Sequence, residues 1–348
     1  MGTITIRGRR IGRGEPAYII AEMSANHAGS IQHAKEIIHA AKEAGADCVK
    51  IQTYTADTMT IDCDNRYFQI TDGTWKGENL YQLYQKAYTP WEWQAQLKEE
   101  AEKIGIDFFS TPFDKTSVDF LESIGMEFYK IASFELVDIP LIRYTASKGK
   151  PIIMSTGMGT LEEIEEAVNA VREAGNSNLA LLRCASAYPA VSDNMNLAAM
   201  QAMQEHFDVP VGLSDHSMGS IGAVTAVAMG GSIIEKHFCL DRKIKNPDSS
   251  FSMEPAEFAA MVQDVRTAER AIGKAEFGAT DSEKGNLAFR RSIFVVRDIA
   301  AGEVLTPENI RIIRPSDGLA PKYYDAVIGR CAAMELKRGT PLQMEMIK

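Results

Sequence analysis

Two consecutive apolar stretches, Pro210-Val211-Gly212-Leu213-Ser214-Asp215-His216 and Ser232-Ile233-Ile234-Glu235-Lys236-His237-Phe238, each break into polar residues at their carboxyl ends. This pattern is typical of buried parallel strands that end at the rim of an active site. Adjacent strands of this kind would bring His216 and His237 to one rim, beside Asp215 and Glu235. Two imidazoles there suit a divalent metal ion such as Mn²⁺, Zn²⁺ or Fe²⁺. Two hydrogen-bonded histidines without a metal are the alternative interpretation.

Six further apolar runs resemble these two, and amphipathic stretches separate them. In chain order the eight runs cover residues 17–24, 46–54, 106–113, 128–133, 151–157, 179–186, 210–217 and 232–240. The stretches between them, such as 31–44 and 161–174, repeat apolar residues at the three- and four-residue spacing of helices. Eight such units in roughly 250 residues predict a closed (β/α)₈ TIM barrel over residues 1–273. An open doubly wound sheet is the rival, weakened because no GxGxxG turn follows the first run.

The composition changes after residue 273. Residues 274–288 are polar and Gly-rich and read as a linker, and residues 289–348 read as a small domain of short strands and turns. Residues 285–348 carry ten Lys and Arg against seven Asp and Glu, whereas the formal charge of the whole chain is −10. A basic tail beside an acidic body indicates that the two parts dock or that the tail helps to hold an anion.

The charge and cysteine content exclude several classes of protein. A charge of −10 argues against nucleic-acid binding, which normally requires a basic face. The five cysteines are widely spaced and form no CxxC pair, which fits a reducing cytoplasm. No apolar run reaches membrane-spanning length and no signal-like segment opens the chain, so we expect a cytoplasmic protein without a membrane partner.

A long, aromatic-rich insert interrupts the regular alternation at residues 55–88. Loops of this length in compact domains are usually functional lids or interface elements. We therefore expect either a lid over the site or a contact between subunits.

Polar side chains end the predicted strands, and in a barrel all of them meet at the carboxyl-terminal face. They include Glu22, Lys50, Gln52, Thr111, Lys130, Ser133, Glu135, Ser155, Tyr188, His216 and His237. Lys50 and Lys130 lie among apolar strand residues, where an ammonium group without an anion is costly. With the surrounding hydroxyls they predict a site for a small anion that carries phosphate and carboxylate. Buried salt bridges from the lysines to Glu22 and Glu135 are the alternative interpretation. A Schiff-base aldolase, in which a lysine is the nucleophile, is disfavoured because imine chemistry does not need the metal ion that His216 and His237 predict.

These motifs, taken in order, resemble the sialic acid synthase family of nonulosonic acid synthases over the whole chain. They are Ile19-Ile20-Ala21-Glu22-Met23-Ser24-Ala25-Asn26-His27, Val49-Lys50-Ile51-Gln52, Tyr129-Lys130-Ile131-Ala132-Ser133, Ser155-Thr156-Gly157-Met158 and the two histidine stretches. Phe289-Arg290-Arg291-Ser292 and Arg314-Pro315 resemble the antifreeze-like SAF (β-clip) domain of that family.

Three stretches most resemble the branch of the family that makes pseudaminic acid. They are Glu22-Met23-Ser24-Ala25-Asn26-His27, Ala87-Tyr88-Thr89-Pro90-Trp91-Glu92-Trp93 and Ser186-Ala187-Tyr188-Pro189-Ala190. Two departures from the family pattern are visible. Ser316 follows Arg314-Pro315 where glycine is expected, and Lys245-Asn246 replace the commoner Gly-Gly before Pro247-Asp248.

The resemblance implies a synthase that condenses phosphoenolpyruvate with an open-chain amino sugar and water, releasing phosphate. It implies that phosphoenolpyruvate is held by Lys50, Lys130, Thr111, Ser133 and Ser155. It implies that His216 and His237 bind Mn²⁺, with Mg²⁺ or Co²⁺ as alternatives, and that the ion polarises the sugar aldehyde. Sugar contacts are implied for Tyr188, Asp248 and Arg314, and Gln52 is expected to bind substrate.

The resemblance also assigns proton chemistry and an assembly. Glu22 would contact metal-bound water or a sugar hydroxyl, and Glu135 would handle the proton of the attacking water. Arg314 would come from the tail domain of a partner subunit, which implies a domain-swapped homodimer. The sugar itself stays open: a legionaminic or N-acetylneuraminic acid synthase is the enzymatic alternative, and a carbohydrate-binding protein is the non-enzymatic one.

Overall fold

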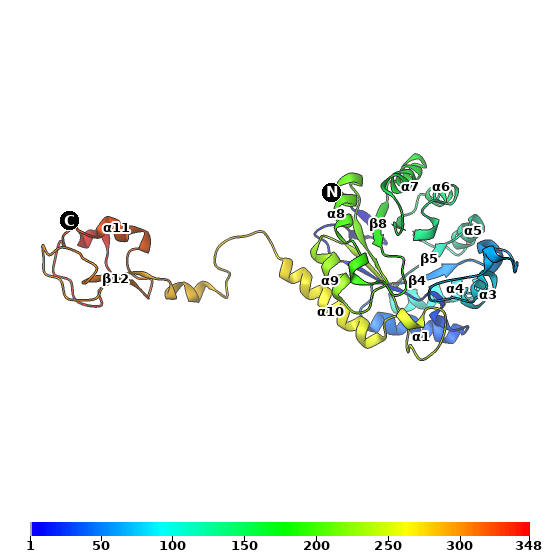
Figure 1. Ribbon diagram of the computed structural model, residues 1–348, viewed down its shortest axis with the longest axis horizontal. Coiled ribbons are helices and arrows are strands. Elements are labelled where there is room, and N and C mark those ends of the chain that lie inside the picture. Colours follow the sequence, from blue (N-terminus) through cyan, green and yellow to red (C-terminus); the bar gives the residue numbers. More distant parts are fainter. Residues whose placement is uncertain (1) are drawn as a thin grey trace. The chain divides into compact units, whose positions relative to one another are not determined.

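The computed structural model describes residues 2–348 and divides the chain into two compact units, Met1–Gly273 and Lys274–Lys348 (Figure 1). The first unit is a closed barrel of eight parallel strands in the order β10-β3-β4-β5-β6-β7-β8-β9. The strands are β3 (Tyr18–Glu22), β4 (Cys48–Thr53), β5 (Asp107–Pro112), β6 (Tyr129–Ile131), β7 (Ile152–Ser155), β8 (Leu179–Cys184), β9 (Val211–Asp215) and β10 (Ile233–His237). Each predicted apolar run contains one strand, so the predicted (β/α)₈ barrel is confirmed.

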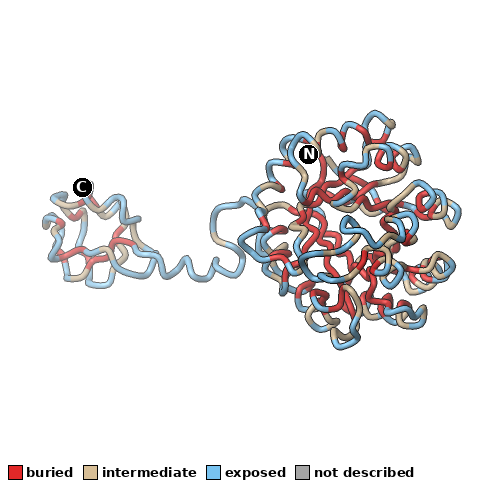
Figure 2. The backbone as a smooth tube through the Cα atoms, turned by 45° about the vertical axis from the view of Figure 1, so that its right-hand side comes forward, coloured by how far each residue is buried: buried red, intermediate tan, exposed pale blue. Residues whose placement is uncertain are grey.

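Helices cover the outside of the barrel. They are α1 (Ile31–Glu43), α4 (Trp91–Ile104), α5 (Lys115–Ser123), α6 (Ile139–Ala146), α7 (Leu161–Glu173), α8 (Ala198–Phe207), α9 (Ile221–Ala228) and α10 (Pro255–Ile272). In α7, Thr160 and Glu163 form a capping box, and the buried stripe includes Ile164, Val168 and Val171. The burial colouring shows the same division, with buried strands inside and exposed helix faces outside (Figure 2).

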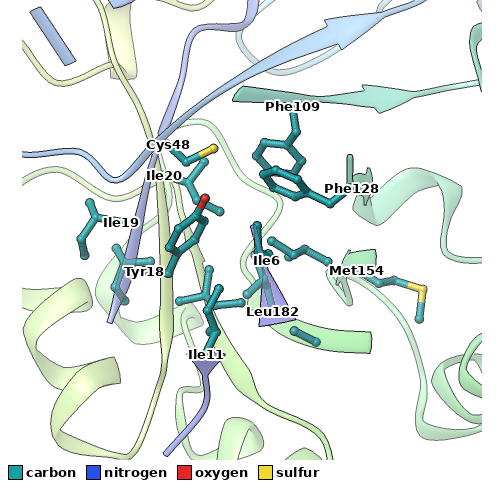
Figure 3. Packing of buried hydrophobic residues seen from close by; sticks show 14 of the residues in the cluster. Ile6, Ile11, Tyr18, Ile19, Ile20, Cys48, Phe109, Phe128, Met154 and Leu182 are labelled. Carbon is teal, nitrogen blue, oxygen red and sulfur yellow. The ribbon is translucent and has the colours of Figure 1, made fainter. Parts of the chain in front are cut away.

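A short hairpin closes the amino-terminal end of the barrel. Its strands are β1 (Ile4–Ile6) and β2 (Arg9–Ile11). Arg9 pairs with Asp47, directly before β4, at 2.5 Å. The side chains of Ile6 and Ile11 lie near Tyr18 and Leu182 of the barrel strands (Figure 3). The sequence pattern did not predict this hairpin, because three-residue strands are too short to show a periodicity.

The loops at the carboxyl ends of the strands contain further short elements. The insert at 55–88 forms α2 (Ala56–Met59), η2 (Arg66–Phe68) and α3 (Leu80–Ala87). Single 3₁₀ turns follow four of the strands: η1 (Ser24–His27), η3 (Ser133–Glu135), η4 (Ser192–Asn194) and η5 (Ser249–Phe251). With the other end closed by the hairpin, this face is where the barrel can present a site.

The second unit has its own core of Ile293, Val295, Ile299, Leu305 and neighbouring apolar residues. Its antiparallel strands are β11 (Ser292–Val295) and β12 (Ile310–Ile313), and its short helices are η6 (Lys284–Phe289), η7 (Pro321–Tyr323), α11 (Tyr324–Val327) and η8 (Met344–Met346). The 3₁₀ helix η6 lies partly in the stretch expected to be a linker. Across residues 2–348, none of the helices combines the length and apolarity required to cross a bilayer.

Candidate active site

Strand register brings the predicted polar residues to one level at the carboxyl end of the barrel. Glu22 on β3 is the register partner of both Lys50 on β4 and His237 on β10. Register partners on neighbouring strands project to the same side of a sheet. Lys50 and Glu22 form an ion pair with a 2.9 Å Nζ–Oε2 distance. Because Lys50 also contacts Glu235 on β10, a strand that is not adjacent to β4, that side is the barrel interior.

The two predicted lysines share the carboxylate of Glu235, for which the sequence predicted no role toward them. Lys50 Nζ lies 2.7 Å from Glu235 Oε1, and Lys130 Nζ lies 4.0 Å from the same oxygen. Lys130 Nζ also donates to Ser155 Oγ at 2.5 Å. All of these side chains are buried. We refer to Glu22, Lys50, Lys130 and Glu235 as the lysine centre.

Burial and charge oppose each other in the lysine centre. Burial lowers the pKa of Lys50 to about 8, and the nearby Glu235 carboxylate only partly offsets the effect. Burial would raise the pKa of Glu235, but the positive charges of Lys130 and Lys50 outweigh it and lower that pKa. The expected partner of the lysines, Glu135, is replaced in this role by Glu235. Lys50 thus forms the ion pair with Glu22 that the alternative interpretation expected and a second one with Glu235, and its contact with a ligand stays a prediction.

Unpaired polar atoms nevertheless mark this end of the barrel as a ligand site. Among residues 2–348, nine buried side-chain nitrogen and oxygen atoms have no hydrogen-bond partner. Four of the nine belong to this rim and have no ion-pair partner either: Thr111 Oγ1, Glu135 Oε2, Glu235 Oε2 and His237 Nδ1. Buried polar groups are normally paired, and a concentration of exceptions requires a partner from outside the chain.

The backbone of Gly157 lies close to two serine hydroxyls of the site. Gly157 N donates to Ser133 Oγ at 3.1 Å. A Cβ atom on Gly157 would lie 2.2 Å from Ser186 Oγ and 2.7 Å from Ser133 Oγ. Only glycine fits there, which explains the Ser155-Thr156-Gly157 motif and keeps the predicted serines close to one another.

The two histidines lie together, with ring centroids 5.3 Å apart. His216 Nδ1 is 3.1 Å from the carbonyl oxygen of Ala185, which can only accept, so Nδ1 donates and Nε2 is the ring atom left to bind an ion. Burial opposes a positive charge on His216, but the contact with Cys184 outweighs burial and raises the pKa of His216. Burial, together with the charges of His216 and Lys50, lowers the pKa of His237 far below its usual range and keeps that ring neutral.

This donor set fits a divalent ion with two protein ligands. Within the described chain there is no group of three or more His, Cys, Asp and Glu side chains placed to hold an ion. Two imidazoles, one of them with an unpaired buried nitrogen, leave the remaining coordination positions to water or substrate, as catalytic metal sites require.

Aromatic rings surround the histidines, and one of them comes from the insert. The Tyr188 ring lies 4.3 Å from His216, 5.1 Å from Phe251 and 5.5 Å from Trp75, centroid to centroid. Trp75 Nε1 donates to the carbonyl of Pro247 at 3.0 Å, and Thr74 Oγ1 donates to that of Tyr188 at 2.5 Å. The insert thus forms part of the rim in its own chain, as expected of a lid. Trp75 and Phe251 are site residues that the sequence reading did not assign.

The remaining predicted residues fall into two groups. Asp248, Gln52 and Glu135 belong to the barrel unit: Asp248 Oδ2 accepts from Ala25 N at 3.1 Å, and Gln52 Nε2 donates to Glu22 Oε1 at 3.4 Å. Burial raises the pKa of Glu135 to about 7. Arg314 is exposed in the second unit, so its contact with the site stays a prediction.

Known proteins share both parts of this chain. The NeuB family model matches residues 37–277 and the SAF domain model matches residues 290–348. Pseudaminic acid synthase from Campylobacter jejuni is 45% identical over 94% of this chain and 95% of its own length. Pseudaminic acid synthase from Helicobacter pylori is 44% identical over 96% of this chain and 98% of its own length.

A solved structure agrees with these relatives. The crystal structure of N-acetylneuraminic acid (sialic acid) synthetase from Leptospira borgpetersenii, in complex with citrate, is 32% identical and has a TM-score of 0.73. The similarity covers 82% of this chain and 95% of the synthetase. Because the family model extends over more than half of the chain and the relatives match it almost end to end, the protein belongs to the NeuB family.

Proposed function

We propose that this protein is a pseudaminic acid synthase. It condenses phosphoenolpyruvate with 2,4-diacetamido-2,4,6-trideoxy-β-L-altropyranose and water to give pseudaminic acid and phosphate. The observation that carries the proposal is the nearly end-to-end similarity to two pseudaminic acid synthases. The site geometry supports it, because two buried lysines, two adjacent imidazoles and a carboxyl group with a pKa of about 7 occupy one end of the barrel.

The lysine centre serves the phosphoenolpyruvate end of the reaction. Its two ammonium groups and two carboxylates sum to no net charge, so an added anion is held by direct contact with an ammonium group rather than by a net positive field. Lys130 is the cation with the weaker ion pair, because its Nζ lies 4.0 Å from Glu235 Oε1, whereas Lys50 Nζ lies 2.7 Å from the same oxygen. Lys130 and Ser155 together offer charge-assisted and hydroxyl donors. Thr111 on β5 has a buried, unpaired hydroxyl, and Ser133 follows β6.

His216 and His237 hold the metal ion, for which we propose Mn²⁺. When bound, the ion supplies Lewis-acid polarisation of the sugar aldehyde. The protein's part is to orient the two rings: the Ala185 carbonyl accepts from Nδ1 of His216 and leaves Nε2 for the ion, and burial keeps His237 uncharged. Asp248, Gln52 and Tyr188 lie around this end and orient the open-chain sugar.

Proton transfer requires a group that can change charge near neutral pH. In the overall reaction, C3 of phosphoenolpyruvate bonds to the aldehyde carbon, water adds to C2, and the bond between C2 and the phosphate oxygen breaks. Glu135, with its pKa raised to about 7 by burial, accepts the proton of the attacking water in its carboxylate form. Glu22, held by Lys50 and Gln52, contacts a sugar hydroxyl or a water at the histidine end.

We extend the proposal to assembly and location. A domain-swapped homodimer would bring Arg314 of one chain to the sugar in the other, and the metabolite substrates place the enzyme in the cytoplasm. The second candidate function is a legionaminic or N-acetylneuraminic acid synthase that takes another amino sugar at the same site. A carbohydrate-binding protein without activity does not account for two buried lysines beside the histidines.

A phosphate-release assay tests the proposal. The protein is incubated with phosphoenolpyruvate, Mn²⁺ and, in separate reactions, the altropyranose substrate, N-acetylmannosamine and the precursor of legionaminic acid. We expect phosphate release to be fastest with the altropyranose sugar and absent without a sugar. Faster release with another sugar selects the second function, and no release with any of them contradicts a synthase.

A further inference from the structure

A buried ion pair lies directly behind the two histidines. Lys236 Nζ donates to Asp215 Oδ2 at 2.7 Å, and both side chains are 1% exposed. Asp215 on β9 and Lys236 on β10 are register partners. Each immediately precedes one of the histidines, so the pair joins the two strand ends that carry His216 and His237.

The alternation of the strands places this pair on the outer side of the barrel wall. Ser214 Oγ donates to Glu235 Oε1 at 3.2 Å inside the barrel, and the histidine rings contact each other on that same side. Asp215 and Lys236, which alternate with these residues, therefore face the helix layer. A Cβ atom on Gly222 of α9 would lie 2.9 Å from Asp215 Oδ2, which locates the pair beneath that helix.

Further hydrogen bonds extend the pair around His216. Lys236 Nζ donates to the carbonyl of Ser217 at 2.6 Å. Asp215 Oδ1 accepts from Ser217 N at 2.8 Å and from Ser217 Oγ at 2.6 Å. The residues on both sides of His216 are thus fixed to each other and to β10.

Stability alone does not account for such a pair. Burying two charges costs several kcal/mol, and an apolar pair of similar volume is often equally stabilising or better. What an apolar pair would not reproduce is the set of directed bonds to Ser217.

We propose that Asp215 and Lys236 are positioning residues that hold His216 and His237 at the separation at which both bind one metal ion. The inference rests on the metal site of the proposed function. Groups that orient metal ligands from behind typically change metal affinity by about 10- to 100-fold when they are removed. We expect the same range here.

The test separates positioning from folding. The double variant Asp215→Leu/Lys236→Met replaces the pair with apolar side chains of similar size. The matched control, Lys150→Met/Glu122→Leu, removes a partly buried ion pair next to the amino-terminal ends of β6 and β7, away from the histidines. For each protein, the Mn²⁺ dissociation constant is measured by calorimetry or electron paramagnetic resonance without substrates, and Tm is measured in parallel.

We expect the double variant to keep its Tm within a few degrees while Mn²⁺ binding weakens about 10- to 100-fold, and the control to bind Mn²⁺ as the wild type does. Unchanged Mn²⁺ affinity in the double variant overturns the inference. If the double variant does not fold, Ser217→Ala decides: weaker binding at unchanged Tm supports positioning, and equal binding overturns it. A wild-type protein that binds no Mn²⁺ instead overturns the proposed metal site.

Discussion

Replacing the two buried lysines one at a time should separate ligand binding from structural support. Lys130→Met removes a cation that contacts only Ser155 and a backbone carbonyl at close range, and leaves Glu235 paired with Lys50. We expect modest destabilisation, because Met fills the volume. Loss of a charge-assisted contact with phosphoenolpyruvate, worth roughly 1.5–3 kcal/mol, should raise its KM about 10- to 150-fold.

Lys50→Met should behave differently, because it removes the ion-pair partner of two buried carboxylates. Lys50 lies 2.9 Å from Glu22 and 2.7 Å from Glu235, and removing it leaves both buried without that partner. Breaking a buried ion pair in this way costs about 3–5 kcal/mol. We therefore expect a large fall in Tm together with a raised KM.

Initial rates of phosphate release at varied phosphoenolpyruvate, with saturating sugar and Mn²⁺, give the KM values, and thermal melts give the stabilities. Lys150→Met, at the opposite end of the barrel, is the control and should change neither KM nor kcat. A Lys130→Met variant with a normal KM for phosphoenolpyruvate and a strongly lowered Tm would refute the assignment of Lys130 to the anion.

Four further outcomes follow from the site. Chelation should abolish turnover, and His216→Ala should lower kcat/KM by more than about 100-fold with little change in Tm; full activity in excess chelator would contradict the metal site. The kcat should fall as the pH drops below about 7, where Glu135 becomes protonated, and Glu135→Gln should abolish this dependence. Burial raises the pKa of Glu135 above its unfolded value, so its ionised form destabilises the folded protein at high pH, and Glu135→Gln should raise Tm more at pH 8 than at pH 5. If the pH dependence of kcat is the same in Glu135→Gln as in the wild type, Glu135 is not the base. Trp75→Ala should raise the KM for the sugar roughly 2- to 12-fold and leave that for phosphoenolpyruvate unchanged; equal effects on both would exclude a sugar contact. Exchange of subunits between inactive Arg314→Ala and Lys130→Ala variants should restore about one quarter of the wild-type sites if Arg314 acts across a dimer, whereas no recovery after verified exchange would mean that it does not.

The barrel could be predicted because its strands are buried on both faces and stand out as apolar runs between periodic helices. The lysines and histidines could be predicted for the same reason, since they interrupt those runs at their carboxyl ends. The hairpin of residues 4–11 could not, because its buried residues alternate over only three positions per strand. Its place is set by contacts with distant residues such as Asp47.

The role of Glu235 could not be predicted without knowing which residues of β10 point into the barrel. In the structure Glu235 faces Lys50, and its neighbour Lys236 faces Asp215 on the other side of the strand. Adjacent polar residues in one stretch do not reveal which of them points inward. The aromatic wall was equally hidden, because Trp75 reaches Pro247 across 172 positions of the chain. Loop contacts of this range depend on the folded geometry rather than on any local pattern.

The most direct test of the proposed function is the identity of the product. The protein is incubated with phosphoenolpyruvate, Mn²⁺ and 2,4-diacetamido-2,4,6-trideoxy-β-L-altropyranose, and the mixture is analysed by mass spectrometry and nuclear magnetic resonance. The account predicts pseudaminic acid and phosphate in equal amounts. Unchanged phosphoenolpyruvate, or a nonulosonic acid formed only from a different amino sugar, would contradict it.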